Sequence, residues 1–294
     1  MALGEIRHIG VIGAGQMGNG IAHVAAQCGL NVTMVDVNPA SLEKALATVA
    51  KNMDRQVQKG TMSADDAKAA QARITTSTSM DALAQADLVV EAATENEVVK
   101  KKIFAELDGI LKPEGIMASN TSSISITRLA AVTKRPERFI GLHFMNPVPM
   151  MALVEIIRGL ATSQETYERV AEVAQKMGKT IATSEDVPGF IVNRLLLPML
   201  NEACYALQDG VADVKSIDTA MKLGAGHPMG PLTLADFIGL DTCVAIMRVL
   251  HQELGDSKYR PCPLLVKFVD AGWLGKKAGR GFYDYSSAEP KPYR

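Results

Sequence analysis

Short apolar runs alternate with longer helical patterns along the first two thirds of the chain. Runs of this kind, bounded by polar residues or glycine, are typical of strands that are buried on both faces of a sheet. We expect strands at residues 9–12, 32–35, 87–93, 115–119, 139–144, 153–157 and 180–183. Helical spacing predicts helices at residues 41–59, 95–111, 126–132 and 164–177. This alternation predicts an α/β fold with a doubly wound, mainly parallel sheet.

The strand pattern stops after residues 186–189, and only helical patterns follow. Helices are expected at residues 190–207, 216–221, 232–254 and 263–271, and Pro198 is expected to kink the first of them. The stretch 279–285 is interpreted as a loop with aromatic anchors. The sequence therefore predicts two domains, residues 1–186 with the sheet and residues 187–294 built of helices.

A glycine-rich turn follows the first predicted strand. In the stretch IGVIGAGQMGNG, three glycines have the spacing G-x-G-x-x-G between a strand and a helix. The first would make the tight turn, the second would let a pyrophosphate approach the backbone, and the third would let the helix pack closely on the strand. We therefore predict a Rossmann-type dinucleotide-binding domain, with cofactor contacts from Gly13, Ala14, Gly15, Gln16, Met17 and Gly18.

An acidic residue at the end of the second predicted strand indicates which dinucleotide binds. Asp36 follows the apolar run 32–35 and lies eighteen residues after Gly18. A carboxylate at this place can accept hydrogen bonds from a ribose 2′-hydroxyl, and it would repel a 2′-phosphate. The alternative is a simple turn residue before Asn38-Pro39. We predict that the cofactor is NAD rather than NADP.

Composition and charge narrow the range of partners. Lys and Arg number 31 against 32 Asp and Glu in 294 residues, so no net charge favours nucleic acid or an anionic membrane surface. No signal peptide or membrane-spanning run is recognisable, which leads us to expect a cytoplasmic protein. We expect reduced thiols and no bound metal, because no C-x-x-C pair or metal-ligand spacing is formed by Cys28, Cys204, Cys243 and Cys262.

Polar residues gather at the carboxyl ends of the predicted strands, the edge where open α/β sheets bind ligands. His143 lies at the end of the run 139–144. An imidazole there can take the proton from an alcohol near neutral pH, as hydride removal to a nicotinamide requires. Glu155, in the apolar run 153–157, would orient this imidazole, and the alternative is an edge-strand acid that faces water. The other four histidines are expected to be structural or surface residues.

Three further polar side chains are candidates for the same site. The hydroxyl of Ser122 and the amide of Asn146 can position a substrate oxygen or the nicotinamide carboxamide. Taken singly, each has a simpler explanation, as a helix cap for Ser122 and a turn residue before proline for Asn146. Asn193 lies at the predicted domain junction, where a substrate in a cleft would bind.

One face of the predicted helix 41–59 is basic, because Lys51, Arg55 and Lys59 recur at intervals of four residues. Such a face is commonly a solvated surface, since long cationic side chains keep their charged ends in water. The alternative is a patch that binds phosphate groups. The residues alone favour the solvated surface.

Five longer motifs point to one family. The chain resembles the short-chain L-3-hydroxyacyl-CoA dehydrogenases, with the bacterial 3-hydroxybutyryl-CoA dehydrogenases as the nearest form. The resemblance extends over essentially the whole chain in order. It is carried by SNTSS from Ser119, HFMNP from His143, LVEIIRG from Leu153, PGFIVNR from Pro188 and HPMGPLTLADFIGLD from His227.

This resemblance implies a reaction and roles for the candidate residues. The family oxidises (S)-3-hydroxyacyl-CoA to 3-oxoacyl-CoA with NAD, reversibly, so the expected substrate pair is 3-hydroxybutyryl-CoA and acetoacetyl-CoA. His143 would be the general base and Glu155 its orienting carboxylate, while Ser122 and Asn193 would contact the substrate oxygens. Further cofactor contacts are implied for Ser122, Glu95, Lys100, Asn146 and Lys277, and CoA phosphate contacts for Lys51 and Arg55.

The resemblance also implies that the helical domain binds substrate and forms a homodimer. Three alternatives remain at this point. The enzyme could act on a CoA ester with a polar tail, such as 3-hydroxyadipyl-CoA, or it could be a sugar-acid dehydrogenase of the same superfamily. A protein of another class, a nicotinamide-binding redox sensor without catalysis, would have no need for the pair His143 and Glu155.

Overall fold

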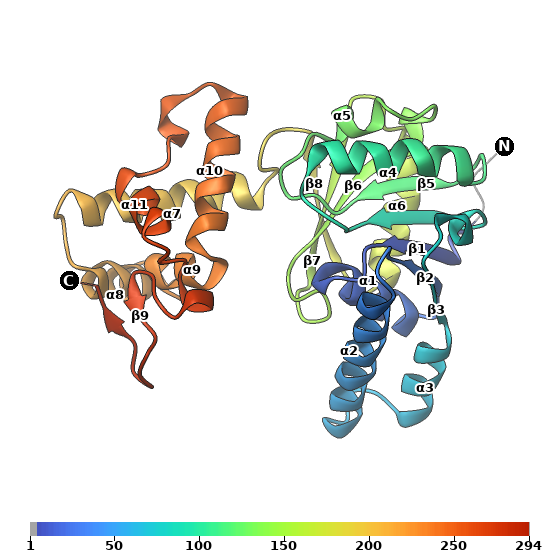
Figure 1. Ribbon diagram of the computed structural model, residues 1–294, viewed down its shortest axis with the longest axis horizontal. Coiled ribbons are helices and arrows are strands. Elements are labelled where there is room, and N and C mark those ends of the chain that lie inside the picture. The colour runs from blue at the N-terminus through green and yellow to red at the C-terminus, as the bar shows by residue number, and fades with distance from the viewer. Residues whose placement is uncertain (1–4, 294) are drawn as a thin grey trace. The chain divides into compact units, whose positions relative to one another are not determined.

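The structure of this protein is a computed structural model that describes residues 5–293. The chain divides into two compact units, Met1–Val187 and Pro188–Arg294. Figure 1 shows the first unit, with its sheet and surrounding helices, in blue to yellow, and the second in yellow to red.

The first unit is built on one eight-stranded sheet with the strand order β3-β2-β1-β4-β5-β6-β7-β8. Every neighbouring pair is parallel except β6 and β7, which are antiparallel. The predicted doubly wound, mainly parallel sheet is therefore confirmed. The strands are β1 (His8–Ile12), β2 (Asn31–Val35), β3 (Ile74–Ser77), β4 (Leu88–Glu91), β5 (Ile116–Ser119), β6 (Phe139–Phe144), β7 (Leu153–Arg158) and β8 (Thr180–Glu185).

Strand β3 has no counterpart among the expected strands. It lies at the edge of the sheet, where only Ile74 is buried and the two threonines after it are exposed. An edge strand needs no continuous apolar run, because one of its sides faces solvent. The pattern that identifies the inner strands is therefore missing here.

The helices of the first unit begin at side-chain caps. The side chain of Asn38 accepts a hydrogen bond from Ala40 N, and that of Ser63 accepts one from Asp66 N, as expected of an N-cap. Asn96 caps the next helix, which therefore starts two residues later than expected. The helices are α1 (Gln16–Gln27), α2 (Pro39–Gln58), α3 (Ala64–Ala72), α4 (Glu97–Ile110), α5 (Ile126–Ala130) and α6 (Gln164–Lys176), with short 3-10 turns at Met80–Leu83 and Pro136–Arg138.

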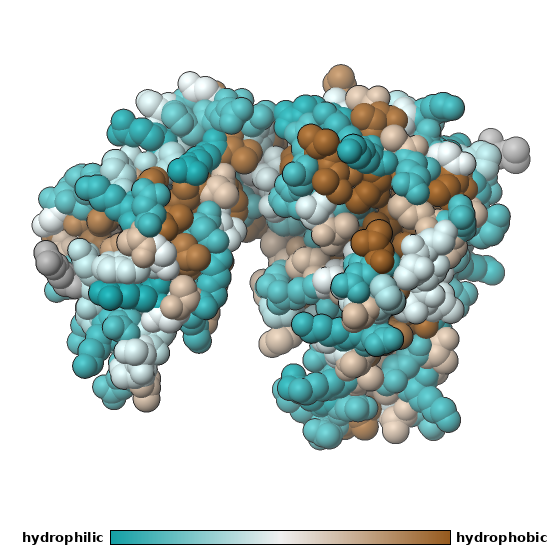
Figure 2. Space-filling model, viewed as in Figure 1, coloured by the Kyte–Doolittle hydropathy of each residue, from teal (hydrophilic) through white to brown (hydrophobic). Residues whose placement is uncertain are grey.

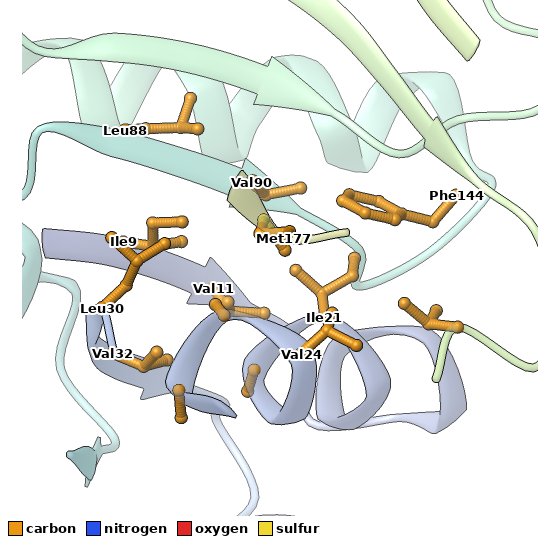
Figure 3. Close-up of a cluster of buried hydrophobic side chains, with 14 of the residues drawn as sticks. Ile9, Val11, Ile21, Val24, Leu30, Val32, Leu88, Val90, Phe144 and Met177 are labelled. Carbon is orange, nitrogen blue, oxygen red and sulfur yellow. The ribbon is translucent and has the colours of Figure 1, made fainter. Parts of the chain in front are cut away.

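One face of the sheet packs against α1 and α6 through apolar side chains. Val11 of β1, Val90 of β4 and Phe144 of β6 belong to one buried cluster with Ile21 of α1 and Val173 of α6. Figure 3 shows Val11, Val90 and Phe144 gathered around Ile21. This face is therefore the structural core of the unit.

The opposite face of the sheet is covered by α4 and α5. The ring of Phe104 in α4 meets the ring of Phe139 in β6 edge-on, with 4.6 Å between centroids. A Cβ atom on Gly141 would lie 2.9 Å from the side chain of Ile126 in α5, so that helix approaches the sheet closely. Because side chains alternate along a strand, His143 shares this face with Phe139 and Gly141.

The second unit is mainly helical, with α7 (Val192–Gln208), α8 (Val214–Gly224), α9 (Pro231–Ile238), α10 (Leu240–Leu254) and α11 (Pro263–Asp270), and with 3-10 turns at Ser257–Tyr259 and Lys276–Ala278. The single helix expected over residues 232–254 is wrong. Gly239 has a φ of 102°, a conformation that ends α9 and lets α10 start in a new direction. The closing stretch is also more than a loop, because β9 (Tyr283–Asp284) pairs with β10 (Lys291–Pro292).

Two buried carboxylates hold the second unit together. Asp236 is completely buried and accepts hydrogen bonds from Phe282 N, Tyr283 N and the hydroxyl of Tyr285. Asp218 accepts from the hydroxyl of Tyr283 at 2.8 Å. Burial raises the pKa of Asp236 to about 6. These bonds fix the last aromatic segment against α8 and α9.

Hydrophilic residues cover most of the visible surface of each unit in Figure 2, with smaller apolar groups between them. Three aliphatic side chains of the second unit, Leu195, Val211 and Leu223, are 70 to 80% exposed. Within residues 5–293, no helix has the length and apolarity needed to cross a membrane.

Candidate active site

The glycine turn has the geometry that its spacing predicts. Gly13 has a φ of 100°, and a Cβ atom there would lie 2.6 Å from the backbone of Ala93. A Cβ atom on Gly18 would lie 1.8 Å from Gly13 O, so α1 starts in direct contact with the turn. Gly15 differs, because a Cβ atom there would meet nothing within 4 Å. The open space therefore lies beside the middle glycine.

Asp36 extends from the end of β2 to this turn. Its carboxylate accepts hydrogen bonds from Ala14 N at 2.8 Å and from Asn38 N at 2.9 Å. No side chain caps the first turn of α1, which begins at Gln16. The free N–H groups and the positive end of the helix dipole at this place favour an anionic ligand.

A cavity of about 430 Å³ opens next to the turn. It is bounded by Gly15 and Gln16, by α2, and by the loop that follows β6. The amide of Gln16 donates to Asn146 Oδ1 at 3.0 Å and so connects the turn to that loop. The residues of α2 that line the cavity are Ser41, Lys44, Ala45, Thr48 and Asn52, and Lys51 and Arg55 are exposed residues outside its lining.

His143 and Glu155 meet as predicted. They are register partners in the antiparallel pair β6 and β7, so both side chains project from the same face of the sheet. His143 Nδ1 lies 2.8 Å from Glu155 Oε2. Glu155 is completely buried and His143 is 8% exposed. The alternative of an edge-strand acid facing water is therefore wrong.

Ser122 lies in a loop that Glu95 organises. One oxygen of the Glu95 carboxylate accepts hydrogen bonds from Thr121 Oγ1 at 2.7 Å, Ser122 N at 2.8 Å and Ser122 Oγ at 3.0 Å. Ser123 Oγ donates to the same oxygen at 3.3 Å. Ser122 is not the N-cap of the following helix, because Ser125 caps α5. The loop is thus held by a single carboxylate.

Lys100 does not project into solvent. Its side chain is 1% exposed, and its ammonium donates to Glu91 Oε2, with Ser119 Oγ 3.4 Å away. Its Nζ atom also lies 3.8 Å from Glu95 Oε2. Sequence reasoning missed both Glu91 and Ser119. The signal that could have found Glu91 is an acid inside the apolar run 87–93, the same signal that identified Glu155.

A second buried lysine supports the loop that carries Asn146. Lys179 Nζ donates to Val148 O at 2.6 Å and to Met151 O at 2.9 Å. Burial lowers the pKa of this amine. Sequence reasoning missed Lys179, because a single lysine before a strand carries no pattern.

Two predicted site residues belong to the second unit. Asn193 lies in the first turn of α7 and is half-buried. Lys277 forms an ion pair with Asp241, with Nζ 2.6 Å from Oδ1. Except for Lys51 and Arg55 on α2, the other candidates lie along the carboxyl edge of the sheet in the first unit. Among the residues it describes, no three His, Cys, Asp or Glu side chains form a metal-binding group.

Comparison with known proteins decides the family. The NAD-binding domain of 3-hydroxyacyl-CoA dehydrogenases matches residues 8–187, and the C-terminal domain matches residues 189–285. The chain belongs to the 3-hydroxyacyl-CoA dehydrogenase family. The prediction from five motifs is therefore confirmed, as is the prediction of an NAD-dependent oxidoreductase.

Several members of this family are similar over their full length. A 3-hydroxybutyryl-CoA dehydrogenase of Bradyrhizobium diazoefficiens is 62% identical, over 98% of this chain and 99% of the relative. A probable 3-hydroxybutyryl-CoA dehydrogenase of Bacillus subtilis is 58% identical, over 96% and 98%. The crystal structure of (S)-3-hydroxybutyryl-CoA dehydrogenase from Ralstonia eutropha is 54% identical and has a TM-score of 0.95, covering 96% of this chain and 100% of that chain.

The glycine turn fits the NAD cofactor of the 3-hydroxyacyl-CoA dehydrogenases. The space beside Gly15 is free of protein atoms within 4 Å of a Cβ position, and the uncapped start of α1 adjoins it. A dinucleotide pyrophosphate needs both features, close access to the backbone and unsatisfied N–H groups. The residues present therefore fit the group that the family uses.

The difference between Gly15 and Gly18 gives a testable prediction. Gly15→Ala should leave the melting temperature nearly unchanged, because Gly15 has a φ of −67° and open space at its Cβ position. The added methyl group would occupy the cofactor space, and we expect the Kd for NADH to rise by roughly tenfold or more. Gly18→Ala should instead lower the melting temperature, because its methyl group would collide with Gly13 O. Thermal unfolding and NADH fluorescence titration check both results, and equal behaviour of the two variants would contradict this assignment.

Proposed function

We propose that this enzyme catalyses the reversible, NAD-dependent oxidation of (S)-3-hydroxybutyryl-CoA to acetoacetyl-CoA. The observation that carries the proposal is the pair His143 and Glu155, 2.8 Å apart and nearly buried in the domain that matches the NAD-binding domain of the family. Support for the short acyl chain comes from the names of relatives that are 62% and 54% identical. A redox sensor would have no use for a buried acid behind an imidazole.

In the proposed mechanism His143 handles the proton. NAD, when bound, supplies the acceptor for the hydride that leaves C3 of the substrate. The imidazole of His143 takes the proton from the C3 hydroxyl oxygen, and in the reverse direction it returns this proton to the oxygen. The Glu155 carboxylate accepts a hydrogen bond from Nδ1 of His143, so it favours the tautomer in which Nε2 is the base. The same carboxylate stabilises the imidazolium that forms when Nε2 takes the proton.

The remaining site residues would bind and orient the reactants. We assign Ser122 and Asn193 to the substrate oxygens, with Ser122 also beside the cofactor. Proposed cofactor contacts are the turn residues Gly13, Ala14, Gly15, Gln16, Met17 and Gly18 together with Asp36, Glu95, Asn146 and Lys277, while the predicted contact from Lys100 is indirect. Because Lys100 is 1% exposed, its contribution would pass through Glu95.

We also propose a separate role for each of the two domains. Residues 1–186 would bind NAD, and residues 187–294 would bind substrate and form a homodimer. The homodimer follows from the resemblance to the family. We place the enzyme in the cytoplasm, where its four free cysteines would stay reduced.

Steady-state assays with acetoacetyl-CoA test the proposed reaction and its cofactor together. We expect turnover with NADH and a kcat/KM lower by roughly a hundredfold or more with NADPH, because Asp36 would repel the 2′-phosphate. 3-Oxoadipyl-CoA serves as the comparison substrate for an enzyme that acts on polar acyl tails. A higher kcat/KM for 3-oxoadipyl-CoA than for acetoacetyl-CoA would overturn the short-chain assignment.

Substitution of the catalytic pair tests the assigned base. His143→Ala should lower kcat by roughly 10²- to 10⁴-fold with little change in the Kd for NADH, because the imidazole moves a proton and does not hold the cofactor. Glu155→Gln should lower kcat and shift its pH profile, because the imidazolium loses its carboxylate partner. Turnover and pH profiles measured on both variants check this, and an unchanged profile for Glu155→Gln would make Glu155 a structural residue.

The basic side of α2 offers a site for the CoA nucleotide. At 100° per residue, Lys44, Lys51 and Arg55 lie within about 40° of one another around the helix axis. We propose that these side chains meet the CoA phosphates beside the cavity, with Asn52 in its lining. Lys44, Lys51 and Arg55 would then all be substrate contacts.

A substrate without the nucleotide separates this contact from general effects. Single changes of Lys44, Lys51 or Arg55 to Met should raise the KM for acetoacetyl-CoA by roughly three- to tenfold each. The same variants should leave the KM for the acetoacetyl thioester of N-acetylcysteamine unchanged. Lys68→Met on α3 is the control, since Lys68 is also an exposed lysine. Equal changes with both substrates would contradict a phosphate contact.

A further inference from the structure

Glu91 is a buried carboxylate that the proposed chemistry does not use. Its side chain is completely buried at the end of β4, and both of its oxygens have partners. Oε1 accepts from Ala93 N at 2.9 Å, while Oε2 accepts from Ser119 Oγ at 2.9 Å and from Lys100 Nζ. The carboxylate thus joins three segments near the carboxyl edge of the sheet.

These partners connect Glu91 to both sides of the cofactor site. Ala93 belongs to the backbone that lies 2.6 Å from a Cβ position on Gly13, so the Oε1 bond supports the wall of the glycine turn. Lys100 lies 3.8 Å from Glu95 Oε2, and the other oxygen of Glu95 gathers the loop at Ser122. Glu91 therefore supports the glycine turn through Ala93, and it supports the Ser122 loop through Lys100 and Glu95.

The contacts of Glu91 lie on the same face of the sheet as His143. Glu91 and Ser119 are register partners on β4 and β5, and Ser119 is the register partner of Gly141 on β6. Since Gly141 and His143 are two residues apart on one strand, all four positions share a face. The network is thus continuous with the strand that carries the general base.

We propose that Glu91 is a positioning residue, which acts through Lys100 and Glu95 to hold the Ser122 loop in the form that binds the dinucleotide. This inference rests on the proposed function of Glu95 and Ser122. A buried ion pair adds little to stability compared with an apolar pair of similar size, so stability alone gives no reason for one here. Without the Glu91 charge, Lys100 keeps Glu95 as its nearest carboxylate and draws it away from the loop.

A double-mutant cycle on NADH binding tests this chain of contacts. Glu91→Gln and Glu95→Gln should each raise the Kd for NADH by roughly tenfold, measured by fluorescence well below the melting temperature. The double variant should bind NADH no more weakly than Glu95→Gln alone, because a glutamine oxygen can still accept from Ala93 N and only the charge that acts through Glu95 is lost. Ser119→Ala removes a single hydroxyl, should raise the Kd by roughly threefold, and should show the same non-additivity if Glu91→Gln does not fold.

The control is another charged pair on the same helix. Asp108 lies on α4 eight residues after Lys100, about 12 Å along the axis, and pairs with Arg135 at 2.8 Å. Asp108→Asn should lower the melting temperature and leave the Kd for NADH unchanged. An unchanged Kd in both Glu91→Gln and Ser119→Ala, or fully additive effects with Glu95→Gln, would overturn the inference. Failure of the unmodified enzyme to bind NADH would instead overturn the proposed function.

Discussion

A carboxylate inside a protein needs partners for its charge and its lone pairs, and the sheet of this enzyme buries two such groups completely. Glu155 pairs with the imidazole of His143 on the neighbouring strand. Glu91 accepts hydrogen bonds from the ammonium of Lys100 on α4 and from the hydroxyl of Ser119 on β5. Both lie on the face covered by α4 and α5. The need to satisfy these two charges therefore concentrates the polar groups of the first unit at one edge of one face.

The face of the sheet that packs against α1 and α6 is apolar. Val90 and Glu91 are neighbours on β4, yet the first belongs to the apolar cluster with α1 and the second to the ionic network with α4. Alternation along the strand separates the two environments by one residue. The apolar face can thus be packed for stability without disturbing the other face, where each side chain needs a specific partner.

Most of the fold follows from local patterns in the sequence, because inner parallel strands are continuous apolar runs and the glycine spacing fixes the first turn. The pair His143 and Glu155 was also predictable, since an acid inside an apolar run must find a partner nearby. The burial of Lys100 was not predictable, because it depends on how α4 packs against β4. The spacing of apolar residues in the sequence does not determine that packing. The helix break at Gly239 was not predicted either, because the apolar spacing continues across it. The positive φ of Gly239 in the structure shows where the helix ends.

The burial of Lys100 has a chemical consequence for an enzyme of acyl thioesters. Thioesters transfer their acyl groups to free amines, and a lysine that is neutral and accessible is the usual target. Lys100 is 1% exposed and its ammonium is occupied by Glu91, so the cation inside the network is shielded from its own reactive substrate. Lys44 and Lys51 on α2 are exposed, so burial gives these two lysines no such shielding.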